Sequence, residues 1–173
     1  MTRLEKPVTS ENADLLETMA QHRYLLRHTV RDLTDEQGAR RTTASALCLG
    51  GLIKHVAFME RRWISFSTEG PSAMGRDDGD TMAGWAAGFR MLEGETLAGL
   101  LDEYAQVAGQ IAAFVVALRD LEVIQPLPEA PWFEPGARWS ARRVLLHLIA
   151  ETAQHAGHAD ILRECLDGAK TMG

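Results

Sequence analysis

The chain has 173 residues, of which 46% are hydrophobic, and this is enough apolar material for one folded domain with a sizeable core. Its 18 Lys and Arg residues against 24 Asp and Glu residues give a formal net charge of −6. This charge excludes the basic footprint by which proteins bind nucleic acid or anionic membranes. No apolar run has the length of a transmembrane helix and the N-terminus lacks an apolar signal core, so we expect a single cytoplasmic domain over residues 1–173.

The hydrophobic pattern is helical along most of the chain. Apolar residues recur at steps of three and four, which is the spacing of one helix face. The predicted long helices cover residues 11–33, 45–66, 97–118 and 141–167. Their expected N-caps are Ser10, Ser45, Thr96 and Ser140, and the expected stop of the last helix is Gly168.

Composition predicts irregular connections between these helices. Residues 34–44 are polar, residues 68–80 are rich in Gly and Asp, and residues 125–137 hold four of the six prolines. We expect the proline-rich segment to be extended. A short extra helix is expected over residues 81–92, where Trp85 would be one of its apolar side chains.

Two adjacent glycines, Gly50 and Gly51, interrupt the second predicted helix. Each lowers helix propensity by about 1 kcal/mol, and glycines inside a helix are typical of a place where a neighbouring segment approaches closely. No stretch alternates as a strand would. Four long amphipathic helices therefore predict an all-α fold, an up-down four-helix bundle with one short extra helix.

A polar stripe marks the last predicted helix. At roughly 100° per residue, His147, Glu151, His155 and His158 fall within an arc of about 80° on one helix face. Such a stripe either forms a polar network or holds a metal, because imidazole and carboxylate are common metal ligands. His147 and His155 are about 12 Å apart along the axis, so one ion cannot take all four. The candidate pairs are His147/Glu151, Glu151/His155 and His155/His158.

A third ligand has to come from another helix. His22 and His28, in the first predicted helix, stand among charged residues and are expected to face solvent or polar groups between helices. His55 lies between Ile53 and Val56 on the apolar side of the second predicted helix and is expected to point into the bundle. Its alternative role is that of a buried histidine hydrogen-bonded to a carbonyl or a carboxylate.

Two motifs carry a family resemblance, LGGLIKHVAFMERRW in the second predicted helix and LLHLIAETAQHAGHADILRECLDG in the last. They resemble the DinB-like superfamily of metal-binding four-helix bundles, in its actinobacterial branch of unknown function, related to the N-terminal domain of mycothiol-dependent maleylpyruvate isomerases. The resemblance implies one divalent metal, zinc or nickel foremost and iron or manganese as alternatives, held by His55, Glu151 and His155. The glutamate departs from the superfamily's three-histidine form and is similar to those isomerases. His147 and His158 become flanking groups and candidate catalytic acid–base residues.

By resemblance, the function is that of a metal- and thiol-dependent transferase or isomerase that uses a low-molecular-weight thiol such as mycothiol, in a homodimer. The metal would lower the pKa of the thiol nucleophile. Trp132 and Trp139, in or beside the proline-rich connection, are expected to cover the mouth of the site. Two alternatives stay open. One is a non-enzymatic bundle or dimer with a buried polar network, and the other is a metal-dependent hydrolase in which a bound hydroxide attacks directly.

Overall fold

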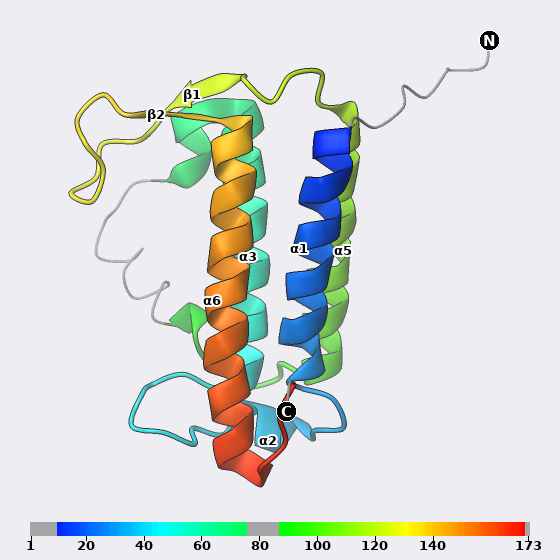
Figure 1. Ribbon diagram of the computed structural model, residues 1–173. Helices are drawn as coiled ribbons and strands as arrows, with labels where there is room; N and C mark the ends of the chain where they lie inside the picture. The colour runs from blue at the N-terminus through cyan, green and yellow to red at the C-terminus, as the bar shows by residue number, and fades with distance from the viewer. Residues whose placement is uncertain (1–9, 76–86, 172–173) are drawn as a thin grey trace.

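The computed structural model describes residues 10–75 and 87–171. Four long helices pack side by side in it (Figure 1), and the predicted all-α four-helix bundle is confirmed. These helices are α1 (Ser10–His28), α3 (Leu49–Glu69), α5 (Leu97–Ala117) and α6 (Ala141–Asp167). None of the helices in the described part of the chain is both long and apolar enough to cross a membrane.

Contacts near the helix ends give the direction of each helix. Arg142 at the start of α6 pairs with Glu11 at the start of α1, and Lys54 near the start of α3 pairs with Glu95 just before α5. The helices α1 and α6 therefore run one way, and α3 and α5 run the other way (Figure 1). Consecutive helices do not alternate throughout, because the chain between α3 and α5 returns to the end of the bundle where α3 began.

The core lies between the four helices and consists of the faces that the spacing predicts. The inward face of α3 comprises Leu49, Leu52, Ile53, Val56 and Trp63, all of them buried. The inward face of α5 comprises Leu97, Leu100, Tyr104, Val107, Ile111 and Val115, also buried. Full burial of one such side chain contributes about 1.5–3 kcal/mol relative to exposure. Packing of these faces, rather than helix propensity, therefore stabilises the bundle.

The predicted caps of α5 and α6 are confirmed. The Thr96 hydroxyl accepts a hydrogen bond from the main-chain N–H of Gly99, and the Ser140 hydroxyl accepts one from that of Arg143. At the other end of α6, Gly168 has a φ of 79°, the left-handed conformation that ends helices and that glycine adopts without a Cβ clash. Local side-chain chemistry thus sets both ends of the helix that carries the polar stripe.

The start of α3 differs from the prediction that Ser45 caps it. The N-cap is Cys48, whose Sγ accepts a hydrogen bond from the main-chain N–H of Gly51. The hydroxyl of Ser45 accepts instead from the N–H of Leu47, in the turn that precedes the helix. A serine that satisfies a local turn has no hydroxyl left for the helix.

The first helix ends five residues earlier than predicted. Its last residue is His28, and Asp32 has a φ of 58°, in the left-handed region that interrupts a helix. Arg163 of α6 donates hydrogen bonds to the main-chain oxygens of Thr29 and Arg31, each at 2.8 Å. These are the oxygens that a longer α1 would need for its own hydrogen bonds.

Short elements lie in connections that were predicted to be irregular. Helix α2 (Asp35–Ala39) starts with a capping box, in which the Thr34 and Gln37 side chains each accept from the other residue's main-chain N–H. The short 3-10 helix η1 (Gly70–Met74) directly follows α3. The Thr-x-x-Gln pattern is a sequence signal of a helix start, so the start of α2 could have been predicted.

The proline-rich connection contains a small hairpin stem. Strand β1 (Ile124–Pro126) pairs antiparallel with β2 (Arg138–Ser140), so that Gln125 lies opposite Trp139. Three-residue strands are too short to produce a visible alternation. Of the predicted short helix over 81–92, residues 81–86 with Trp85 lie outside the described residues, and the two helical residues 87–88 are followed by a turn.

Candidate metal centre

The three predicted ligands lie on α3 and α6, two helices that pack against each other (Figure 1). The ring of His55 on α3 contacts the ring of His155 on α6 edge to face, with centroids 4.9 Å apart. Glu151 lies one turn before His155, and its Oε2 is 3.6 Å from His155 Nε2. The inward position predicted for His55 is confirmed, since the residue is buried.

The two remaining histidines of the stripe lie at either end of this group. His158 Nδ1 is 3.4 Å from His155 Nδ1, and His147 Nε2 is 4.0 Å from the second oxygen of Glu151, Oε1. The stripe is therefore continuous, and His147 and His155 approach different oxygens of one carboxylate. Both flanking histidines are half-buried, within reach of small molecules.

One wall of the centre is Phe89, which lies in the segment predicted as a short helix over residues 81–92. Its ring stacks on His55 with a centroid distance of 3.9 Å and an interplanar angle of 24°. A Cβ at Gly51 would overlap the main-chain oxygen of Phe89, which also accepts a hydrogen bond from Cys48 Sγ. The close approach predicted at this glycine is confirmed, and it positions Phe89 over the histidine.

The opposite end of the stripe is walled by two tryptophans. The rings of Trp63 and Trp139 stack with centroids 4.7 Å apart, and the ring of His147 packs edge to face on both, at 4.8 Å and 5.1 Å. Trp139 belongs to β2, so the hairpin holds it beside α6. Trp132 is 64% exposed and contacts Phe133.

Burial and neighbouring charges set the protonation of the centre. Burial is the main cause that lowers the pKa of His55 to about 4, helped by nearby His155 and opposed by Glu151. Burial likewise lowers the pKa of His147. The hydrogen bond with His155 lowers the pKa of Glu151, and the neighbouring histidines add to this. Near neutral pH His55 and His147 are therefore neutral imidazoles and Glu151 is an ionised carboxylate, the forms that bind a cation.

The donor types fit a divalent metal, although the side chains are not arranged around one. Among residues 10–75 and 87–171, no three His, Cys, Asp or Glu side chains are grouped so as to hold an ion. Both ring nitrogens of His155 face other side chains, Glu151 and His158. Two imidazoles and a carboxylate suit zinc, nickel, iron or manganese. Metal binding would require side-chain rotations to reach ligand distances of about 2.0–2.2 Å.

A buried ionic cluster that was not predicted lies in the core. Glu60 of α3 is 1% exposed, and Arg23 of α1 donates to both of its oxygens, at 2.9–3.1 Å. The hydroxyls of Tyr104 on α5 and Thr152 on α6 donate to Glu60 Oε1. Burial raises the pKa of Glu60, whereas Arg23, Thr152 and Tyr104 act to lower it.

The position of Glu60 was readable from the sequence. It lies four residues after Val56 and three before Trp63, and both of these belong to the apolar face of α3. A carboxylate at that spacing has to be buried and therefore has to be paired. The cluster joins all four long helices through one residue, and Thr152 directly follows the candidate ligand Glu151.

The fold defines the class of protein. The four-helix bundle is of the DinB-like type that the motifs predicted, and this DinB-like family is metal-dependent. Comparison with known families narrows the class. The chain belongs to the mycothiol-S-transferase family, whose model matches residues 14–168. No curated protein matches the chain at a significant level.

Proposed function

We propose that the protein is a metal-dependent transferase that joins the sulfur of mycothiol to an electrophilic carbon of a second substrate. The observation that carries the proposal is that His155 lies against both His55 and Glu151 in a chain of the mycothiol-S-transferase family. Of the two predicted thiol-dependent reactions, transfer and isomerisation, the family favours transfer.

In this proposal one divalent ion, with zinc or nickel foremost, is held by His55 of α3 and by Glu151 and His155 of α6. The burial that keeps His55 neutral and the ionisation of Glu151 support the assignment. When bound, such an ion supplies an ionised thiol at neutral pH, because a thiol on a cation loses its proton readily.

His158 and His147 are the proposed proton acceptors for the thiol. Burial lowers the pKa of His147, so this ring is neutral and able to take a proton near neutral pH. The sulfur electron pair forms the new C–S bond, and the bond from carbon to the leaving group breaks with its electrons on that group. One of these histidines first takes up the thiol proton. It then passes the proton to the leaving group or to water.

The aromatic walls account for binding of the second substrate. Phe89 packs at the His55 end and the Trp63–Trp139 pair at the His147 end. These apolar faces suit an apolar or aromatic electrophile and limit access of water, which would compete with the thiol.

The test is a conjugation assay with purified protein, mycothiol and an aryl or alkyl halide, followed by mass spectrometry of the thioether. We expect conjugation that requires both mycothiol and enzyme, and a loss of at least about 100-fold in His55→Ala. The matched control is His28→Ala, a histidine of α1, which should keep the wild-type rate. Ester hydrolysis without any thiol would favour the hydrolase instead. Wild-type conjugation in His55→Ala would contradict the site.

Two broader predictions stay open to experiment. One is that residues 1–173 form a single domain, and the other is that the protein is a homodimer, as the DinB-like family implies. A single cooperative unfolding transition would support the first. Sedimentation equilibrium would test the second, and a monomer at micromolar concentration would contradict it.

A further inference from the structure

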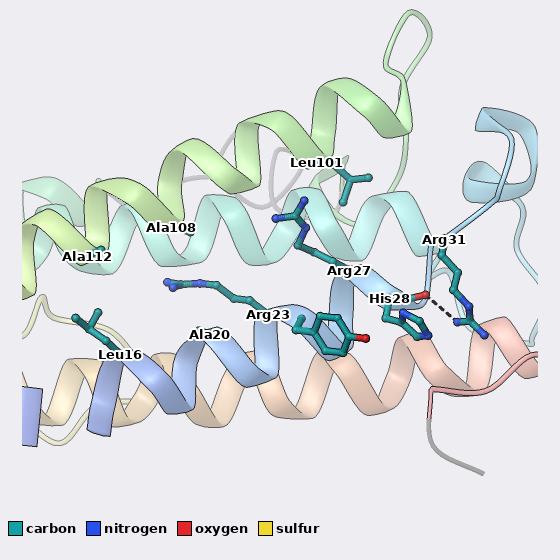
Figure 2. A pocket seen from close by; sticks show the side chains of 10 residues that line it. Leu16, Ala20, Arg23, Arg27, His28, Arg31, Leu101, Ala108 and Ala112 are labelled. Carbon is teal, nitrogen blue, oxygen red and sulfur yellow. Dashed lines mark hydrogen bonds between the residues drawn. The ribbon is translucent and has the colours of Figure 1, made fainter. Parts of the chain in front are cut away.

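A groove of about 690 Å³ lies between α1 and α5, a different helix pair from the one that carries the candidate metal centre. Figure 2 shows its side chains, with the α1 residues on one side and the α5 residues on the other. Its apolar part includes Leu16, Ala20, Ala108 and Ala112. Small side chains on both helices leave this space open, and its volume is in the range of small-molecule sites, roughly 300–1,000 Å³.

The charged part of the groove is basic. Arg23, Arg27 and Arg31 line it from α1 and the turn after it, and among the described residues no Asp or Glu lines it. Arg23 is buried and its charge is matched by Glu60. Arg27 is exposed and has no ion pair or hydrogen bond within the described part of the chain. An unmatched cation beside an apolar surface favours an anionic ligand.

Arg31 adds a second cationic side chain at the same end. Its guanidinium donates hydrogen bonds to the main-chain oxygens of His28 and Lys170, at 2.9 Å and 3.2 Å. The charge of Arg31 helps to lower the pKa of Asp167, but Asp167 forms its ion pair with Arg163. Arg31 is therefore fixed in place, and Arg27 is the cation most available to a ligand.

The unmatched cation and the alanines lie at different places along the groove. Figure 2 places Leu16, Ala20 and Ala112 toward one end, and Arg27 and Arg31, with Leu101, toward the other. The guanidinium of Arg23 reaches toward the alanine end, but its charge is matched by Glu60. Ala20 and Arg27 are about 10 Å apart along the α1 axis. A ligand that matches this arrangement has an apolar chain of about that length and an anionic head.

We propose that the α1–α5 groove binds a free medium-chain carboxylate, with its carboxylate at Arg27 and its chain against the alanines. The charge pattern disfavours a second copy of this chain as the occupant. In a two-fold interface the same patch meets itself, so that Arg27 and Arg31 would face the same arginines of the partner.

The first experiment is titration calorimetry with decanoate, 1-decanol and acetate as probes. We expect saturable binding of one decanoate, binding of 1-decanol at least about tenfold weaker, and no binding of acetate. Arg27→Gln should lower the affinity for decanoate about tenfold. The matched control is Arg119→Gln, an exposed arginine beyond the end of α5 and outside the groove, which should leave the affinity unchanged.

A second variant tests the apolar part independently. Ala108→Leu keeps helix propensity and fills the groove, so it should also weaken decanoate binding. His55→Ala should bind decanoate as the wild type does, which separates this site from the proposed metal centre. No decanoate binding at millimolar concentration would overturn the proposal. Equal affinities for decanoate and 1-decanol, or for the wild type and Arg27→Gln, would overturn it too.

Discussion

Glu60 of α3 connects the four long helices. Its carboxylate receives hydrogen bonds from Arg23 on α1, Tyr104 on α5 and Thr152 on α6. Removal from water disfavours an isolated charge strongly, and these donors offset the penalty only while all of them are in place. The cluster therefore favours one arrangement of the four helices over others of similar apolar packing.

Loss of this carboxylate should be costly for stability. In Glu60→Gln and Glu60→Ala, Arg23 keeps a buried charge without its partner, and the free energy of unfolding should fall by about 3–5 kcal/mol. The matched control is Glu103→Gln, which breaks the Arg61–Glu103 pair, with side chains 44% and 45% exposed. Glu103→Gln should lower the free energy of unfolding by less than about 1 kcal/mol. Urea unfolding measures both, and equal losses in the two variants would contradict the role given to Glu60.

At the scale of an element, the segment that carries Phe89 is held against the start of α3 in two ways. Gly51 allows its main chain to approach the helix, and the Lys54–Glu95 ion pair fixes it from the other side. Lys54 Nζ also donates to the main-chain oxygen of Arg90. These contacts set how Phe89 covers His55.

Gly51→Ala should disturb this approach. The added Cβ would meet the main-chain oxygen of Phe89, and backbone cannot move aside as easily as a flexible side chain. We expect the free energy of unfolding to fall by about 1–3 kcal/mol despite the higher helix propensity of alanine. Gly109→Ala, on α5 with open space around it, should instead gain about 0.5–1 kcal/mol. Thermal or urea unfolding compares the two, and a gain in Gly51→Ala would contradict the close contact.

The Lys54–Glu95 pair predicts a dependence of stability on pH. Burial acts to raise the pKa of Glu95, but the Lys54 ammonium and the N–H of Leu92 outweigh it and lower this pKa below 4.5. A lowered carboxylate pKa contributes stability above the unfolded value and loses it as pH falls through the folded value. When the pH drops from neutral to below the pKa of Glu95 in the folded protein, the free energy of unfolding should therefore fall by about 1 kcal/mol more in the wild type than in Glu95→Gln. Parallel curves of unfolding free energy against pH would contradict this.

At the scale of the whole molecule, the sequence predicted which face of a helix is buried wherever apolar residues recur at helical spacing. The spacing of Leu49, Leu52, Ile53 and Val56 placed the inward face of α3, and Thr96 and Ser140 placed two helix starts. The same spacing cannot give the direction of a helix, because an apolar stripe looks alike in both orientations. The parallel α3 and α5 therefore follow from the connection and its contacts, such as Lys54 with Glu95.

Spacing alone left three candidate pairs on the polar stripe, and the family resemblance selected Glu151 and His155, together with His55, as the predicted ligands. In the structure these three side chains approach one another. Phe89 reaches the site from an irregular segment and Trp139 from the three-residue strand β2, and neither segment carries a periodic signal in the sequence. The burial of Glu60 follows from its spacing on the apolar face of α3, but its partners Arg23, Tyr104 and Thr152 lie on other helices and carry no local signal.

The central claim is that His55, Glu151 and His155 hold one divalent metal, and metal analysis of protein purified without an affinity tag tests it most directly. The account predicts about one equivalent of metal in the wild type and in His28→Ala, and less than about a tenth of an equivalent in His55→Ala and His155→Ala, provided circular dichroism shows the helices intact. A wild-type protein that takes up less than about a tenth of an equivalent after dialysis against zinc or nickel, or a full equivalent in His55→Ala, would contradict it.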